Sequence, residues 1–190
     1  MRNIAIFASG SGTNAENIIN YFSTRNSAKV SLVLSNNRNA FVLERAARLN
    51  TRSVFFDRKE FYVTGKVLRY LQLYKIDFVV LAGFLWLIPE DILNEYEGKI
   101  INIHPALLPN HGGKGMYGDH VHRSVLKNND KESGITIHKV NSKYDSGDII
   151  TQVKCKVDSS DTVDSLAAKV HELEYLHYPQ IIEQLILKMV

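Results

Sequence analysis

The sequence predicts a Rossmann-like α/β fold in three layers, α/β/α, built on a mostly parallel sheet. In the first half of the chain, short apolar runs alternate with segments of helical spacing, which is typical of βαβ units. In the second half, two segments alternate between polar and apolar residues and predict a C-terminal antiparallel strand pair. The 190 residues show no repeat, low-complexity tract or linker, which favours one domain spanning residues 1–190.

The parallel strands are predicted where apolar runs end at glycine or at polar residues. They are Asn3–Ser9, Val30–Leu34, Ser53–Phe56, Asp77–Ala82 and Lys99–Ile103. Asp77–Ala82 is the most hydrophobic run, which predicts a strand at the centre of the sheet. Helical spacing predicts the connecting helices at Asn14–Phe22, Ala40–Leu49 and Glu60–Tyr74, and a further helix that starts at Pro89. The expected apolar side of Glu60–Tyr74 consists of Val63, Val67, Leu68 and Leu71.

The pattern changes after the fifth strand. Pro105–Asp119 is a predicted loop with four glycines, and Val121–Lys127 a predicted short helix. The predicted antiparallel strands are Gly134–Val140 and Asp148–Val157. Asp161–Met189 has a long helical pattern, and we expect an interruption near Pro179 because proline lacks the N–H that a helix interior needs.

Composition excludes several classes of protein. The formal net charge is +3 and the Lys and Arg residues are scattered, so nucleic-acid binding is not expected. Cys155 is the only cysteine, which rules out an internal disulfide framework and predicts a structural thiol. The apolar run Ile4–Ser9 is shorter than a signal-peptide core or a membrane span, so we expect a cytoplasmic protein without a membrane segment. His111, His120 and His122 have no recognised metal-ligand spacing, and no metal is expected.

Three polar clusters follow predicted strands. They are Gly10–Asn14, Asn102–Pro109 and Asn141–Asp148. In open α/β sheets, ligands bind outside the carboxyl ends of the strands. The sequence therefore predicts a ligand site where these clusters meet.

The first cluster is a glycine loop between a strand and a helix. Gly10 and Gly12 permit a tight turn, and the free N–H groups of a first helical turn suit a phosphate. Thr13 and Asn14 add side-chain donors, and either could be the N-cap; a capped turn without a ligand is the alternative. No carboxylate ends the second strand, which counts against a nicotinamide dehydrogenase, and no Gly-Lys-Ser/Thr follows, which counts against a Walker A loop. The loop therefore favours a terminal phosphate.

The second cluster places Asn102 and His104 two residues apart on a strand, so both side chains point to the same face. An amide N–H can stabilise an oxyanion, and imidazole can move a proton near neutral pH. No serine or cysteine nucleophile accompanies them, which favours direct transfer. A nearby carboxylate would raise the pKa of the imidazole, and Asp145 and Asp148 are both candidates; an Asx-type turn is the structural alternative for each.

The sequence resembles a known family at four places. The matching stretches are Gly10–Asn14, Val79–Phe84, Asn102–Pro109 and Tyr144–Gly147. The Asn-x-His-Pro-x-Leu-Leu-Pro stretch is similar to that of the superfamily that uses 10-formyltetrahydrofolate. The early glycine loop and the length resemble the phosphoribosylglycinamide (GAR) formyltransferases within it. This resemblance covers about Asn3 to Pro179 and implies transfer of a formyl group from 10-formyltetrahydrofolate, as co-substrate, to the amine of GAR in purine synthesis.

The resemblance also implies roles for individual residues. The implied catalytic group is Asn102, His104 and Asp145. The implied GAR-binding residues are Gly12, Thr13, Asn14 and Glu174. The implied folate-binding residues are Lys59, Leu85, Trp86, Leu87, Ile88, Asn102, Asn141, Ser142, Lys143, Tyr144 and Asp145. A cis Leu108–Pro109 bond and a monomer or homodimer are expected as well.

Two features depart from the family pattern. Trp86 stands where the family often has an arginine, so an ionic contact with folate is lost there. The segment Asn110–Gly118 is longer than the usual loop and is either a lid that carries Lys114 or a variant loop. The alternatives to a GAR enzyme are a sugar-amine N-formyltransferase acting on a nucleotide sugar and a non-catalytic nucleotide- or folate-binding domain. A methionyl-tRNA formyltransferase is disfavoured because no basic tRNA-binding extension is present.

Overall fold

The computed structural model describes residues 1–189, in which one seven-stranded sheet has the order β3-β2-β1-β4-β5-β6-β7. The strands are β1 (Arg2–Phe7), β2 (Ala28–Ser35), β3 (Ser53–Phe55), β4 (Phe78–Leu81), β5 (Ile100–His104), β6 (Glu132–Lys139) and β7 (Ile149–Lys156). The first five strands run parallel, and β6 and β7 are antiparallel to their neighbours. The predicted fold class is confirmed, and β4 lies at the centre of the sheet as its hydrophobicity predicted.

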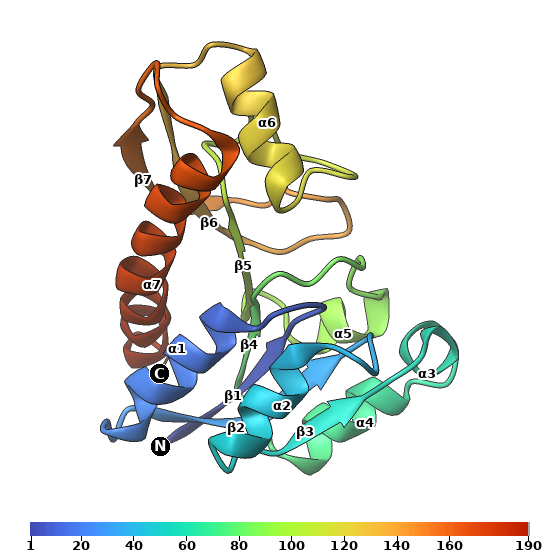
Figure 1. Cartoon of the computed structure of the whole chain (residues 1–190). Coiled ribbons are helices and arrows are strands. Elements are labelled where there is room, and N and C mark those ends of the chain that lie inside the picture. Colours follow the sequence, from blue (N-terminus) through green and yellow to red (C-terminus); the bar gives the residue numbers. More distant parts are fainter. Residues whose placement is uncertain (190) are drawn as a thin grey trace.

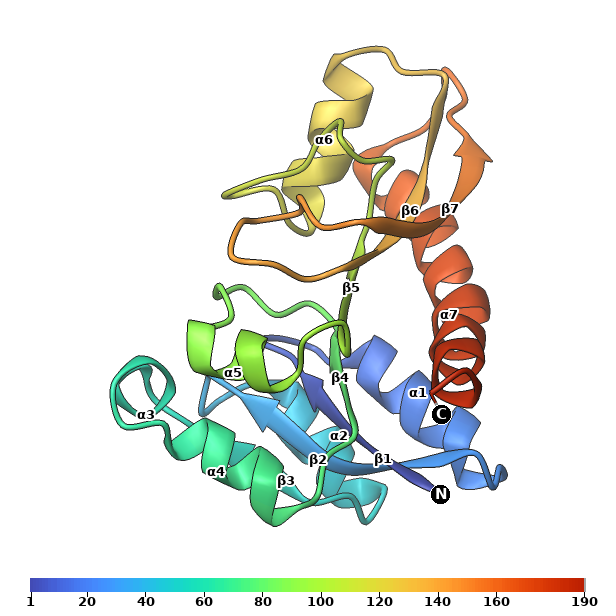
Figure 2. The same cartoon turned by 180° about the vertical axis from the view of Figure 1, so that it is seen from behind.

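Helices cover both faces of the sheet, which gives the three layers (Figures 1 and 2). One face packs against α1 (Thr13–Ser23), α2 (Phe41–Arg48), α6 (Asp119–Lys127) and α7 (Val163–Leu187). The other face packs against α3 (Arg58–Tyr62), α4 (Lys66–Leu73) and α5 (Glu90–Glu95). Alternate residues of β1 enter the two cores: Ile4 and Ile6 face the first, and Ala5 and Phe7 the second. This double burial explains why the parallel strands are continuous apolar runs.

The single helix predicted at Glu60–Tyr74 is wrong, because α3 and α4 are separate helices. Asp57 and Glu60 form a capping box that starts α3, and Gly65 adopts a left-handed φ of 62° that starts α4. Val63 falls in the break between the two helices and is 75% exposed, so its expected place on the apolar side is also wrong. Val67 and Leu71 are buried as predicted.

The interruption expected near Pro179 is also wrong, since α7 continues through this residue. Proline has no N–H to donate to the carbonyl of Tyr175, four residues earlier. The side-chain amide of Asn17 on α1 donates to that carbonyl instead, at 2.8 Å. A neighbouring helix thus satisfies the free acceptor, and α7 stays intact.

Tyr178 anchors the middle of α7 to the centre of the sheet. Its ring is fully buried, and its hydroxyl donates to the carbonyl of Leu81 on β4 at 2.8 Å. This contact fixes the helical turn that precedes Tyr178 beside the carboxyl ends of β4 and β5. Cys155 on β7 is a free, half-buried thiol that packs against the core.

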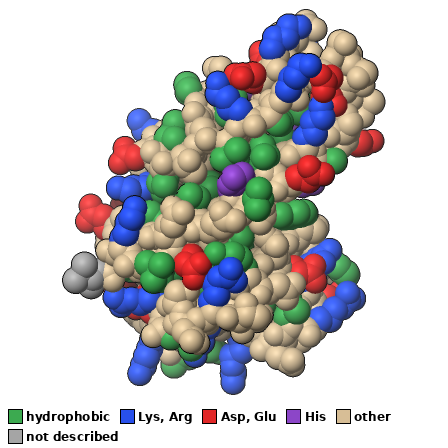
Figure 3. All heavy atoms as spheres, turned by 90° about the vertical axis from the view of Figure 1, so that its left-hand side faces the viewer, with side chains coloured by type: hydrophobic (Ala, Val, Ile, Leu, Met, Phe, Trp, Pro, Cys, Tyr) green, Lys and Arg blue, Asp and Glu red, His purple; other side chains and the backbone are tan. Residues whose placement is uncertain are grey.

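The outer surface carries mixed charge. On the face shown in Figure 3, Lys and Arg side chains lie among Asp and Glu side chains and hydrophobic ones. The two ends of the described chain lie side by side, where the Arg2 guanidinium donates to the carbonyl of Met189 at 3.1 Å. No helix within residues 1–189 is long and apolar enough to cross a membrane.

Candidate active site

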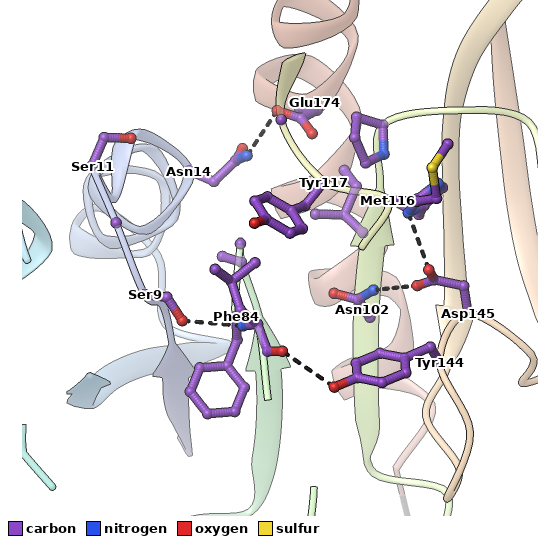
Figure 4. Close-up of a pocket in the computed structure, with 18 of the residues that line it drawn as sticks. Ser9, Ser11, Asn14, Phe84, Asn102, Met116, Tyr117, Tyr144, Asp145 and Glu174 are labelled. Atoms are coloured by element: carbon purple, nitrogen blue, oxygen red, sulfur yellow. Dashed lines mark hydrogen bonds and ion pairs between the residues drawn. The ribbon is translucent and has the colours of Figure 1, made fainter. Parts of the chain in front are cut away.

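A cavity of about 660 Å³ lies at the carboxyl ends of the parallel strands. The glycine loop after β1, the segments after β4 and β5, the loop before α6 and one side of α7 form its walls (Figure 4). The predicted site residues that line it are Gly12, Thr13, Asn14, Leu85, Trp86, Asn102, His104, Tyr144, Asp145 and Glu174. Residues from the three polar clusters of the sequence therefore meet in one cavity.

The glycine loop opens the first turn of α1 toward this cavity. Gly12 is the N-cap, with a φ of 76°, and no side chain caps the helix. The expectation that Thr13 or Asn14 is the N-cap is therefore wrong, because the helix starts at Thr13. A Cβ atom on Gly12 would lie 2.3 Å from Cγ2 of Val42, so only glycine fits between α1 and α2. The uncapped N–H groups of this turn can bind an anion.

Asn102, His104 and Asp145 converge on one point of the cavity. Asn102 and His104 both lie on β5, two residues apart, and Asp145 lies in the loop between β6 and β7. The Asp145 carboxylate is 3.5 Å from Nδ2 of Asn102 and 3.6 Å from Nδ1 of His104. Asp148 points elsewhere: its side chain is 86% exposed and lies 3.8 Å from the Lys139 ammonium. The fold thus brings Asp145, and not Asp148, to the two strand residues.

Burial and the neighbouring charges act in opposite directions on the pKa values of this group. Burial lowers the pKa of His104, although Asp145 and the carbonyl of His111 oppose this effect. As predicted, the Asp145 carboxylate acts to raise the pKa of the imidazole, but the loss of solvent around His104 has the larger effect and the net pKa is lowered. Burial raises the pKa of Asp145, but His138, His104 and the Gly113 N–H together lower it below its usual range. Asp145 is consequently a carboxylate at neutral pH, and free His104 is mainly neutral.

His138 is a member of this cluster that the sequence did not indicate. It is buried on β6, directly opposite Asn102 in the strand register. Its Nδ1 lies 2.8 Å from the carbonyl of Lys139, and its Nε2 lies 3.6 Å from Oδ1 of Asp145. In the neutral ring the proton is on Nδ1, because a carbonyl can only accept, and Nε2 is then an acceptor. The Asn102 amide donates to this Nε2 at 3.1 Å, so His138 fixes the orientation of Asn102. The sequence could not indicate His138, because its place beside Asn102 depends on the pairing of β6 with β5, and local patterns do not predict which strands pair.

Glu174 lies across the cavity on α7. Its carboxylate accepts a hydrogen bond from Nδ2 of Asn14 at 2.9 Å. Burial raises its pKa to about 7, although the Asn14 hydrogen bond opposes this effect. A largely buried acid with such a pKa, next to the open end of α1, is a typical feature of a ligand site.

Several predicted folate residues lie outside the cavity wall. They are Lys59, Leu87, Ile88, Asn141, Ser142 and Lys143. Ile88 is buried in the core, and the carbonyl of Leu87 accepts a hydrogen bond from the Tyr62 hydroxyl at 2.9 Å. Asn141 forms the Asx-type turn of its loop, accepting from the N–H of Lys143 at 2.9 Å. The neighbouring cation Arg58 does not line the cavity either, but its guanidinium lies 5.6 Å from the centre of the ring of Trp86, which does.

Other lining residues were not among the predicted site residues. They include Ser9, Phe84, Met116, Tyr117, His122 and His171. Lys114 also lines the cavity, so the long loop after Pro109 forms part of the wall. The Leu108–Pro109 bond before this loop is cis, as the family resemblance implied. Among residues 1–189, no group of three His, Cys, Asp or Glu side chains is placed to hold a metal ion.

The fold and the polar group at the strand ends define a formyl transferase: a family model of that description matches residues 2–182. The *Bacillus subtilis* phosphoribosylglycinamide formyltransferase is 35% identical, with 98% of this chain and 95% of the relative covered. The *Escherichia coli* protein of the same name is 36% identical over 95% and 85% of the two chains. This chain belongs to the formyl transferase family and, within it, to the phosphoribosylglycinamide formyltransferases.

Solved structures agree with this assignment. The phosphoribosylglycinamide formyltransferase of *Anaplasma phagocytophilum* superposes with a TM-score of 0.90 at 32% identity, covering 98% of this chain and 87% of the other. That of *Streptococcus pneumoniae* superposes with a TM-score of 0.86 at 37% identity, covering 97% and 99%. The likeness therefore extends over nearly the whole fold.

Proposed function

We propose that this protein transfers the formyl group of 10-formyltetrahydrofolate to the amine of GAR, giving formyl-GAR and tetrahydrofolate in de novo purine synthesis. One observation carries the proposal: a single cavity joins an uncapped helix N-terminus to the Asn102, His104 and Asp145 group. The first feature suits the phosphate of GAR, and the second suits the reaction at a formyl carbon. Membership of the family supplies the identity of the two substrates.

GAR would bind along the α1 side of the cavity. Gly12, Thr13 and Asn14 would hold its phosphate through the first turn of the helix. Glu174 already accepts from Asn14 and would accept hydrogen bonds from the polar groups of GAR between the phosphate and the amine. This arrangement directs the amine toward β5.

The folate would bind on the opposite side of the cavity. Leu85 and Trp86 after β4 line this side together with Tyr144. The Tyr144 hydroxyl lies 3.5 Å from the carbonyl of Leu85, so the two segments are already joined in the free protein. The aromatic face of Trp86 suits a flat ring, and Arg58 above it offers a cation in place of the predicted Lys59.

The proposed chemistry uses Asn102, His104 and Asp145 together with one water molecule. The GAR amine would attack the formyl carbon, and the oxygen of the tetrahedral intermediate would accept from Asn102 Nδ2 and from protonated His104 Nδ1. The negative charge on that oxygen would favour the protonated imidazole, whose pKa is lowered in the free protein. Asp145 would hold His104 and a water that passes the amine proton to the folate nitrogen. The bond between carbon and this nitrogen then breaks, and no metal is required.

A transfer assay tests the proposal. Purified protein with 10-formyltetrahydrofolate would be given GAR or an amino-sugar nucleotide, and release of tetrahydrofolate would be followed by absorbance. Formyl-GAR as the only product supports the proposal. Formylation of the amino sugar alone, or binding of both substrates without transfer, would overturn it. Cytoplasmic location and a monomeric or homodimeric state stay predictions.

A further inference from the structure

The ring of His104 is held from behind by the loop that follows β5. Its Nε2 lies 2.8 Å from the backbone carbonyl of His111. A carbonyl can only accept, so the proton of the neutral ring is on Nε2. Nδ1 is then turned toward Asp145 and the cavity, which is the atom that the proposed reaction uses.

The side chain of His111 fixes the part of the loop that carries this carbonyl. Its Nε2 lies 2.6 Å from a carboxylate oxygen of Asp130, and its Nδ1 lies 2.9 Å from the hydroxyl of Ser124 on α6. The ring therefore donates to Asp130 and accepts from Ser124. The side chain is only 7% exposed, and the backbone of His111 has a left-handed φ of 54°, which a non-glycine residue rarely adopts. Two side-chain contacts thus hold an unfavourable backbone conformation in place.

The same loop reaches Asp145 two residues later. The N–H of Gly113 donates to the Asp145 carboxylate at 2.9 Å. At Gly112, a Cβ atom would lie 2.5 Å from Cδ2 of Leu108 and 3.3 Å from Cβ of Asp145, so the loop passes these residues as closely as glycine permits. Both His104 and Asp145 therefore depend on where residues 111–113 lie.

We propose that His111, anchored by Asp130 and Ser124, is a positioning residue that sets the ring orientation and tautomer of His104 for formyl transfer. This inference rests on the proposed function for its effect on rate, but its effect on His104 can be measured without turnover. Neither Asp130 nor Ser124 lines the main cavity, so their substitution leaves substrate contacts intact. Displacement of a reacting group by about 1 Å can lower a rate by about 100-fold.

Steady-state kinetics of two Asp130 variants provide the first test. In Asp130→Ala, the His111 ring loses its acceptor, and we expect kcat to fall about 10- to 100-fold while KM for GAR and folate changes little. In Asp130→Asn, the side-chain oxygen still accepts from His111, and we expect kcat within about threefold of wild type. Glu132→Ala removes an exposed carboxylate two residues away and is the matched control, with unchanged kcat. Ser124→Ala is the milder second variant if Asp130→Ala does not fold.

The tautomer of His104 is the second, independent readout. Long-range ¹H–¹⁵N spectra, recorded at a pH where the ring is neutral, should show the proton on Nε2 in wild type. Asp130→Ala or Ser124→Ala should shift this population toward Nδ1–H, and Asp130→Asn should not. A drop in kcat with an unchanged tautomer, or wild-type kcat in Asp130→Ala, would overturn the inference. Wild-type protein that does not formylate GAR would instead contradict the proposed function, and the spectra would still test the role of His111.

Discussion

Glu174 and Asn14 are hydrogen-bonded at 2.9 Å although 160 residues separate them in the chain. The contact joins α7 to the first turn of α1, at the end of the cavity where a phosphate is proposed to bind. Because Glu174 is buried, its pKa is raised from 4.5 to about 7. The carboxyl group at the proposed GAR side of the cavity therefore changes its charge near neutral pH.

This raised pKa predicts a pH-dependent stability. Glu174 binds its proton more tightly in the folded state, so its protonation favours folding below the unfolded pKa of 4.5. That contribution is lost as the pH rises from 4.5 through about 7, and amounts to about 3 kcal/mol. Glu174→Gln cannot ionise and should therefore gain stability relative to wild type between pH 5 and pH 8. Urea unfolding at the two pH values measures this, and Glu172→Gln on the exposed side of α7 is the control. If the difference in unfolding free energy between Glu174→Gln and wild type is the same at pH 5 and pH 8, the pKa of Glu174 is not raised.

The two strand residues should be essential for turnover. Removing a donor to an oxyanion typically lowers kcat by about 10² to 10³, and we expect at least this loss in Asn102→Ala and in His104→Ala. Circular dichroism should show an intact fold in both variants. His177→Ala, on α7 and away from the cavity wall, should retain full activity. Full activity in His104→Ala would remove the basis of the proposed mechanism.

Asp145 and Asp148 provide a matched pair of carboxylates in one loop. Asp145→Asn removes the charge that opposes the lowering of the His104 pKa, so this pKa should fall further and kcat should drop by about 10² or more. Asp148→Asn changes an exposed side chain and should affect neither value. NMR titration of the His104 ring and steady-state kinetics give the two measurements. Equal losses of kcat in the two variants would show that turnover does not depend on the proximity of Asp145 to His104.

Gly12 and Gly10 lie in the same loop, but the structure requires glycine only at position 12. A Cβ atom at Gly12 would collide with Val42, and the φ of 76° disfavours any other residue, so Gly12→Ala should cost roughly 2–4 kcal/mol. It should also raise KM for GAR, because the first turn of α1 would move. A Cβ atom at Gly10 meets nothing within 4 Å, and Gly10→Ala should leave the stability nearly unchanged. Denaturant unfolding of the two variants compares them, and similar losses would contradict the structural explanation.

The sequence by itself determined the features that depend on local spacing. Alternating apolar runs and helical segments predicted the sheet and its central strand, because burial on two faces leaves a continuous hydrophobic run. The two-residue spacing of Asn102 and His104 placed both on one face of β5, since side chains alternate along a strand. Local pattern also misled: Gly65 starts a new helix, and Asn17 keeps α7 continuous at Pro179.

Only the tertiary structure decided which distant residues meet. It placed Asp145 beside His104, put His138 opposite Asn102, and directed the carbonyl of His111 to the His104 ring. These contacts depend on the order of strands in the sheet and on the path of two loops. Periodicity reports the face on which a residue lies but carries no information about its partner across the fold. The chemistry of the site therefore follows from the packing of elements that the sequence specifies one at a time.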